Sequence, residues 1–153
     1  VDLSGPTSPL AGWLRALGFA PLELGPAWGG SGADPADDPL DVDTASLDVL
    51  TRVHPGGCGS GDVDATLASA SWALRTGGVL VLTLPVGDDD PDWAVRPADV
   101  RGVLARADDL GLGLVGDVDA SVTARMRRAA TVAATAGGDA PAYGILRLTF
   151  RRR

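Results

Sequence analysis

The segment spanning residues 46–86 constrains the fold most strongly, because two strand-like patterns flank one helix-like pattern. Residues 47–53 form an apolar, β-branched run, and a second run of this kind covers residues 79–84. Between them, apolar residues recur at helical spacing over residues 62–75, and Thr76-Gly77-Gly78 then stops the helix. This order of strand, helix, glycine and strand predicts a βαβ unit of a parallel sheet.

The remaining chain extends this unit into an α/β domain. Continuous apolar strands are typical of a sheet that helices cover on both faces, which indicates a three-layer sandwich. The chain is long enough for one domain, which we expect to span residues 1–153. Residues 26–43 are expected to form a loop, and residues 121–142 a helix and connector before the last strand. The patterns predict the remaining elements as strands at 1–3, 19–24, 112–115 and 143–150, and helices at 9–17, 97–110 and 121–136.

Three short segments of the central unit resemble a known family. They are Leu47-Asp48-Val49-Leu50, the helix end Trp72-Ala73-Leu74-Arg75-Thr76-Gly77-Gly78, and Leu80-Val81-Leu82-Thr83-Leu84-Pro85. Their order and spacing are similar to the second half of class I S-adenosylmethionine (SAM)-dependent methyltransferases. The resemblance implies a Rossmann-like, mostly parallel sheet, with a last strand that runs antiparallel beside the sixth. It also implies that SAM is the cofactor.

The resemblance places the cofactor turn at the start of the chain, where the sequence reads Asp2-Leu3-Ser4-Gly5-Pro6-Thr7. By this match Asp2, Ser4 and Gly5 contact the cofactor. The turn departs from the glycine-rich family motif, since Gly5 is the one motif glycine that is kept. Glycine matters there because the backbone must bend sharply and let a ligand approach closely.

Acidic residues are the family's contacts to the rest of the cofactor. Gly25 lies where the ribose-binding acid is expected, and Glu23 is on the same face of the strand, two residues earlier. A competing alignment makes Asp2 the ribose acid. Asp37 lies near the place of the adenine contact, as do its neighbours Asp34 and Asp38. The interval 26–43 has little room for a helix and a third strand, so we predict a reduced third-strand region.

His54 follows the strand at 47–53 and is the candidate proton acceptor. It is the chain's one histidine, and its imidazole titrates near neutrality when unperturbed. An ordinary structural or exposed histidine is the alternative. Cys58 is four residues away, but Pro55-Gly56-Gly57 between them disfavours an ordered nucleophilic pair.

The composition limits the kinds of partner and the location that we expect for this protein. The net charge of −7 argues against nucleic acid, whose phosphates need a basic surface. No apolar run approaches the ~20 residues of a membrane span, and no signal-peptide pattern is present, so we expect a cytoplasmic protein. The aspartates of residues 88–92 lack the spacing of a calcium loop, and we expect no metal site. The expected partner is a small-molecule substrate, with a homodimer or a protein partner left open.

Three functions stay open at this point. The first is SAM-dependent methyl transfer to an unknown small molecule, in which approach and orientation do most of the catalytic work. The second is a methyltransferase-like interaction or scaffold domain that has lost cofactor binding, which the eroded glycine turn favours. The third, another nucleotide-binding α/β protein such as a reductase, is disfavoured because no dinucleotide glycine fingerprint exists.

Overall fold

The structure is a computed structural model that describes most of the second half of the chain and part of the first. The described residues are 9–21, 42–53, 60–87, 94–118, 121, 124–125, 128, 131–132, 135 and 143–153. The helices are α1 (Pro9–Ala16), α2 (Ser60–Ala73), the short 3₁₀ helix η2 (Pro97–Asp99) and α3 (Val100–Asp109). The strands are β1 (Leu47–Arg52), β2 (Leu74–Gly87), β3 (Leu112–Leu114) and β4 (Tyr143–Arg152).

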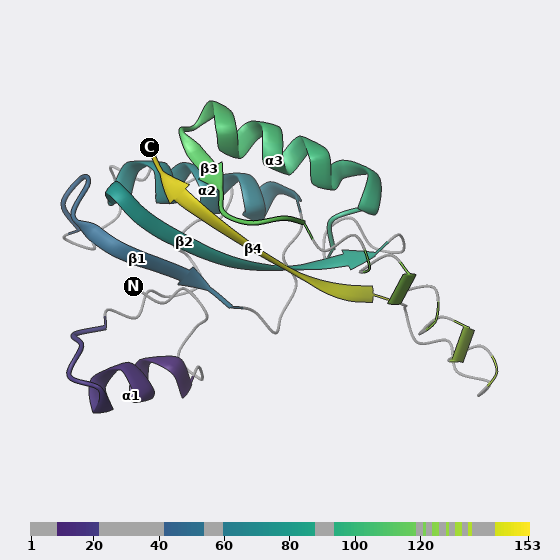
Figure 1. The fold of residues 1–153 in the computed structure, drawn as a ribbon, viewed down its shortest axis with the longest axis horizontal. Helices are drawn as coiled ribbons and strands as arrows, with labels where there is room; N and C mark the ends of the chain where they lie inside the picture. Colours follow the sequence, from purple (N-terminus) through teal and green to yellow (C-terminus); the bar gives the residue numbers. More distant parts are fainter. Residues whose placement is uncertain are drawn as a thin grey trace.

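The described strands form one mixed sheet in the order β1-β2-β4-β3 (Figure 1). β1 and β2 are parallel, and α2 connects them, as the βαβ pattern predicts. β4 runs antiparallel to both β2 and β3 and lies between them. The expectation of an antiparallel last strand beside the strand at residues 112–115 is therefore confirmed.

One face of the sheet, which we call the core face, carries the hydrophobic core. Register aligns Leu50, Leu80 and Phe150 across β1, β2 and β4, and all three side chains are fully buried. Because side chains alternate along a strand, every second residue of β2 and β4 joins this face. Helices α2 and α3 cover it (Figure 1). The α2 residues turned to the core are Val63, Leu67 and Ala70, which recur at helical spacing and are also fully buried.

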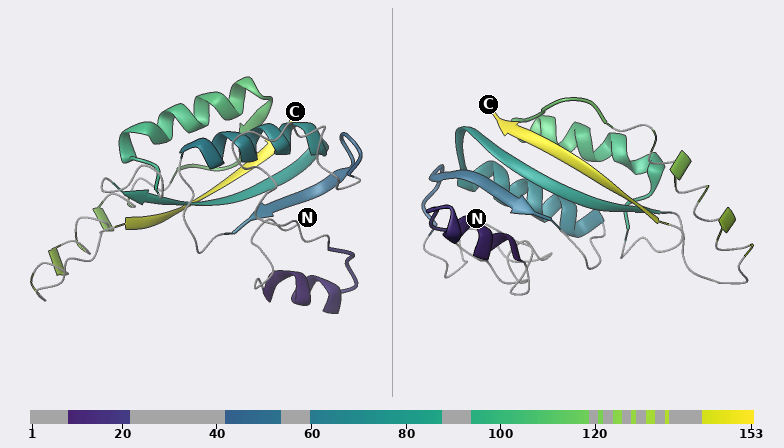
Figure 2. Two further views of the ribbon diagram at one scale, coloured as in Figure 1. Left: turned by 180° about the vertical axis from the view of Figure 1, so that it is seen from behind. Right: turned by 60° about the horizontal axis from the view of Figure 1, so that its bottom comes forward.

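Helix α1 lies on the opposite face, next to β1 (Figure 2). This α1 face is less covered, since Val49 on β1 and Ile145 on β4 are each close to half exposed. With α2 and α3 on one side and α1 on the other, the sheet is the middle of three layers. The chain thus has the α/β, Rossmann-like architecture that the sequence predicts.

Some element boundaries differ from the sequence prediction. Strand β2 is longer at both ends: it begins at Leu74, inside the predicted helix and before the predicted glycine stop, and it continues past Pro85 to Gly87. Residues 19–21, predicted to begin a strand, are in no strand of the structure, because Gly18 turns the chain back after α1. Gly18 has a φ of 87°, its N–H donates to the carbonyl of Arg15, and the N–H of Phe19 donates to that of Leu14. These are the two hydrogen bonds of a Schellman motif.

Several predicted segments fall wholly or partly outside the described residues. The strand at 1–3 and the reduced third-strand region within 26–43 stay predictions, because residues 22–41 and 1–8 are not described. Of the predicted helix at 121–136, the described residues from Ala124 to Thr135 are helical, and Ser121 lies in a turn.

Candidate functional site

The site residues that the sequence predicts cannot be placed in the structure. Asp2, Ser4, Gly5, Glu23, Asp37 and His54 all lie outside the described residues. The proposed cofactor contacts and the proposed proton acceptor therefore stay predictions. The structure does describe the carboxyl end of β1 and the space between β1 and α1.

The carboxyl end of β1 is the place where ligands bind in open α/β sheets. Arg52 ends the strand, and its guanidinium donates a hydrogen bond to the hydroxyl of Thr66, a fully buried residue of α2. The hydroxyl of Thr83 on β2 donates to the backbone carbonyl of Arg52 at 3.5 Å. The first of these contacts holds the Arg52 side chain against α2.

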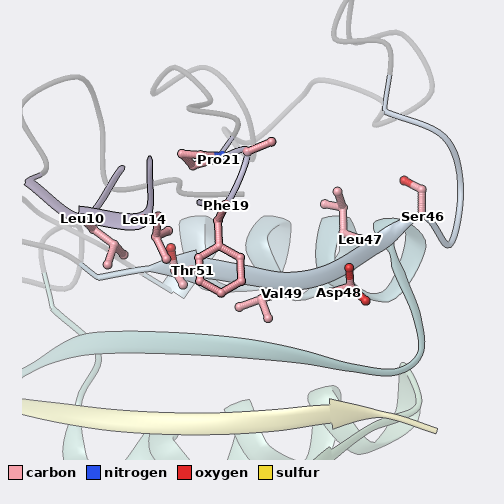
Figure 3. A pocket seen from close by; sticks show the side chains of 10 residues that line it. Leu10, Leu14, Phe19, Pro21, Ser46, Leu47, Asp48, Val49 and Thr51 are labelled. Carbon is pink, nitrogen blue, oxygen red and sulfur yellow. The ribbon is translucent and has the colours of Figure 1, made fainter. Parts of the chain in front are cut away.

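The described residues line a cavity between α1 and β1 that is open to solvent on one side, and we call it the α1–β1 cavity (Figure 3). It has a volume of about 620 Å³. Leu10 lies near the Thr51 end of β1, and Ser46 marks the opposite end (Figure 3). Its ten lining residues are Leu10, Leu14, Phe19, Ala20, Pro21, Ser46, Leu47, Asp48, Val49 and Thr51.

The local fold explains the walls of this cavity. Leu10 and Leu14 are four residues apart, so they share the side of α1 that faces β1. The Schellman turn at Gly18 brings Phe19 back toward β1, where its ring lies over the strand between Thr51 and Val49 (Figure 3). Alternation along β1 places Val49 and Thr51 on the same face, opposite these residues.

The polar groups at the cavity are few and already engaged. Among the described residues that line it, Asp48 is the one ionisable residue, and its carboxylate forms an ion pair of 2.5 Å with the guanidinium of Arg75. The hydroxyl of Ser46 donates to the backbone carbonyl of Asp43 at 2.6 Å. The cavity is therefore an apolar space with one neutralised carboxylate at its edge.

The sequence pattern of α1 indicates only part of this arrangement. It predicts that Leu10, Trp13, Leu14 and Leu17 share one buried helical face. In the structure Leu10 and Leu14 are half-buried against the cavity, whereas Trp13 and Leu17 are 66% and 73% exposed. The sequence does offer one signal of this arrangement, because apolar residues occur on both sides of this short helix.

Two other kinds of site are absent from the part of the chain that the structure describes. No described helix is long and apolar enough to cross a membrane. Over the same residues, no three His, Cys, Asp or Glu side chains gather as a metal site would require.

Comparison with known proteins shows which solved structures this fold resembles. No protein-family model and no curated protein matches the chain. Among solved structures it is similar to geranyl diphosphate methyltransferase in complex with SAM, with a TM-score of 0.51 and 13% identity over 100% of this chain and 68% of that chain. It is also similar to the [4+2]-cyclase SpnF, with a TM-score of 0.47 and 14% identity over 93% of this chain and 61% of that chain. For the aminoglycoside resistance methyltransferase NpmB1 the TM-score is 0.46, with 16% identity over 79% of this chain and 59% of that chain.

This chain thus spans about two thirds of the geranyl diphosphate methyltransferase and less of the other two proteins. The similarity to the geranyl diphosphate methyltransferase and the strand order agree on one architecture. The strand β4 lies between β2 and β3 and is antiparallel to both, and helices lie on both faces of the sheet (Figure 2). The chain has the fold of the class I SAM-dependent methyltransferases.

Proposed function

We propose that this protein is a SAM-dependent methyltransferase that acts on a small molecule. The observation that carries the proposal is the fold, which it shares with a methyltransferase solved in complex with SAM. When bound, SAM would supply an electrophilic methyl group, so the protein's task is to orient an acceptor toward it. The residues proposed to hold SAM are Asp2, Ser4 and Gly5, with Glu23 and Asp37 toward the ribose and adenine.

One observation favours a second function, that of a non-catalytic interaction domain. Trp13 and Leu17 are large apolar side chains four residues apart, and they are 66% and 73% exposed. Exposed apolar residues on one side of a helix are typical of sites that bind another protein. Together with the departure from the glycine-rich turn, they support a methyltransferase-like scaffold as the alternative.

Isothermal titration of the purified protein with SAM and S-adenosylhomocysteine tests the proposal. We expect micromolar binding of both ligands and its loss in Gly5→Val and in Asp2→Ala. Gly12→Val and Asp109→Ala are matched controls, because Gly12 has open space around it and Asp109 is exposed at the end of α3. Both controls are expected to bind like the natural sequence.

The outcomes separate the two functions. No heat and no thermal shift at millimolar cofactor would overturn methyl transfer and favour the scaffold. Binding that survives both Gly5→Val and Asp2→Ala would keep the function but contradict the proposed cofactor turn. A partner search by co-purification, with Trp13→Ser as the disrupting variant, then addresses the scaffold directly.

A further inference from the structure

We propose that the α1–β1 cavity is a binding site for a small, uncharged, apolar molecule. This inference does not depend on methyl transfer. The cavity lies between α1 and the face of β1, whereas the proposed cofactor contacts belong to the start of the chain and to the loops beyond the strand ends. It follows from the size, the wall chemistry and the charge of the cavity.

The size suits an organic molecule rather than water alone. A volume of about 620 Å³ falls within the 300–1,000 Å³ that is usual for sites that bind small organic ligands. The walls are set by β1, by α1 and by the turn between residues 18 and 21. Such sites are mostly apolar, with a few polar groups at fixed places.

The walls offer apolar surface that the protein itself does not cover. Phe19 on one wall is 63% exposed and Val49 on the other is 44% exposed, and both line the cavity. Leu10 and Leu14 contribute the aliphatic surface of α1. A ligand between the two walls would remove this surface from water, and that is the main favourable contribution to apolar binding.

Charge complementarity sets the class of ligand. None of the described residues that line the cavity is Lys, Arg or His, so an anionic ligand would lose its hydration without gaining a cation. The Asp48 carboxylate already faces Arg75, which leaves no uncompensated negative charge for a cationic ligand. The remaining polar groups are the hydroxyls of Thr51 and Ser46, which suit at most a neutral hydrogen-bonding group.

Two fluorescent probes that differ by one charge test this proposal. N-phenyl-1-naphthylamine is uncharged, and 8-anilinonaphthalene-1-sulfonate carries the same rings with an added sulfonate. We expect the uncharged probe to bind saturably at one site per chain, and the sulfonate to bind at least tenfold more weakly. Equal affinity for the two probes, or no binding of the uncharged one, would overturn the proposal.

Substitutions place the probe in the cavity. Val49→Phe fills the space with an apolar residue that suits a strand, and we expect it to weaken the uncharged probe at least tenfold. Leu17→Ser is the matched control, in the turn directly after α1, because Leu17 is 73% exposed and is not among the residues that line the cavity. Ile145→Ser is a second control, on β4 of the same sheet face. Both controls should leave the affinity unchanged.

Each outcome decides the question. Loss of binding in Leu17→Ser would place the probe on the exposed side of α1 and refute the cavity. Full binding in Val49→Phe would refute it as well. If circular dichroism finds Val49→Phe unfolded, Ala20→Phe replaces it, because Ala20 lines the cavity from outside any helix or strand. The assay contains no SAM, so its result is independent of the proposed methyl transfer.

Discussion

Gly78 in β2 offers the sharpest test of how the central unit is packed. A Cβ built at Gly78 would lie 2.8 Å from the carbonyl oxygen of Arg75 and 2.9 Å from that of Leu47. Both neighbours are backbone atoms, and Leu47 belongs to β1, so relief requires β1 and β2 to separate where Leu47 pairs with Leu74. Overpacking of this kind costs about 1–3 kcal/mol. We expect Gly78→Ala to lower the free energy of unfolding by that amount.

The adjacent Gly77 has a different requirement and provides the comparison. Its φ is 82°, and a Cβ at this residue would have no atom within 4 Å, so conformation rather than space limits the position. Asn adopts this left-handed conformation more readily than Ala. We therefore expect Gly77→Asn to be milder than Gly77→Ala, whereas Gly78→Asn is at least as harmful as Gly78→Ala.

Urea unfolding followed by far-UV circular dichroism measures these four variants. The natural sequence and Gly12→Ala, a substitution in open space on α1, are the controls. If Gly78→Ala stays within about 0.5 kcal/mol of the natural sequence, the size of an ordinary surface effect, the close approach of β1 and β2 is wrong. The reasoning is also refuted if Asn destabilises the protein less than Ala does at position 78 but not at position 77.

Three further predictions concern the core, the helices and the last strand, and urea unfolding measures all of them. Phe150 is fully buried, so Phe150→Ala should cost about 3–5 kcal/mol, and a loss under about 1 kcal/mol would contradict its place in the core. Arg106 on α3 forms an ion pair of 2.6 Å with Asp64 on α2, and both side chains are over 40% exposed. Arg106→Ala should therefore lower the free energy of unfolding by about 0–1 kcal/mol, and this loss should be smaller still in high salt. The Arg152 guanidinium donates at 2.6 Å to the carbonyl of Leu110, just past the end of α3, so Arg152→Met should cost about 1–3 kcal/mol; an unchanged midpoint would refute this tie between β4 and α3.

The parallel pair of strands is predictable from sequence because its signal is local. Both β1 and the segment from Val79 to Leu84 of β2 are mostly apolar, and apolar residues recur at helical spacing between them. The glycines at 77 and 78, predicted to stop the helix, instead belong to β2. The length of β2 is not predictable in this way, since Pro85 is ordinarily a strand breaker. The pairing of β2 with β1 ends at Leu82, and beyond it the carbonyl of Pro85 accepts a hydrogen bond from the N–H of Val95. Pro85 therefore lies beyond the part of β2 that pairs with β1, so its missing N–H costs no hydrogen bond to β1.

The predicted strand at 19–24 is wrong for residues 19–21, while residues 22–24 lie outside the described residues. Residues 19–24 are mostly apolar, and such a run fits a buried strand as well as a segment that packs on one. The hydrogen bonds of the turn at Gly18 decide between the two, because they reverse the chain over the end of α1. The sequence marks Gly18 as a helix stop but does not indicate the direction in which the chain leaves it.

Different parts of the chain carry different kinds of information. The segment that is easily recognised from sequence, residues 46–86, supplies the parallel strands β1 and β2 and the helix between them, and a fold can be kept at 13% identity because packing tolerates many apolar residues. The proposed cofactor binding would depend instead on a few backbone positions near Gly5, and a cavity depends on how far two elements stand apart. Neither property has a periodic signal, so the α1–β1 cavity emerges only from the three-dimensional structure. A shared fold does not decide ligand binding, so the proposed cofactor site and the α1–β1 cavity are separate questions with separate assays.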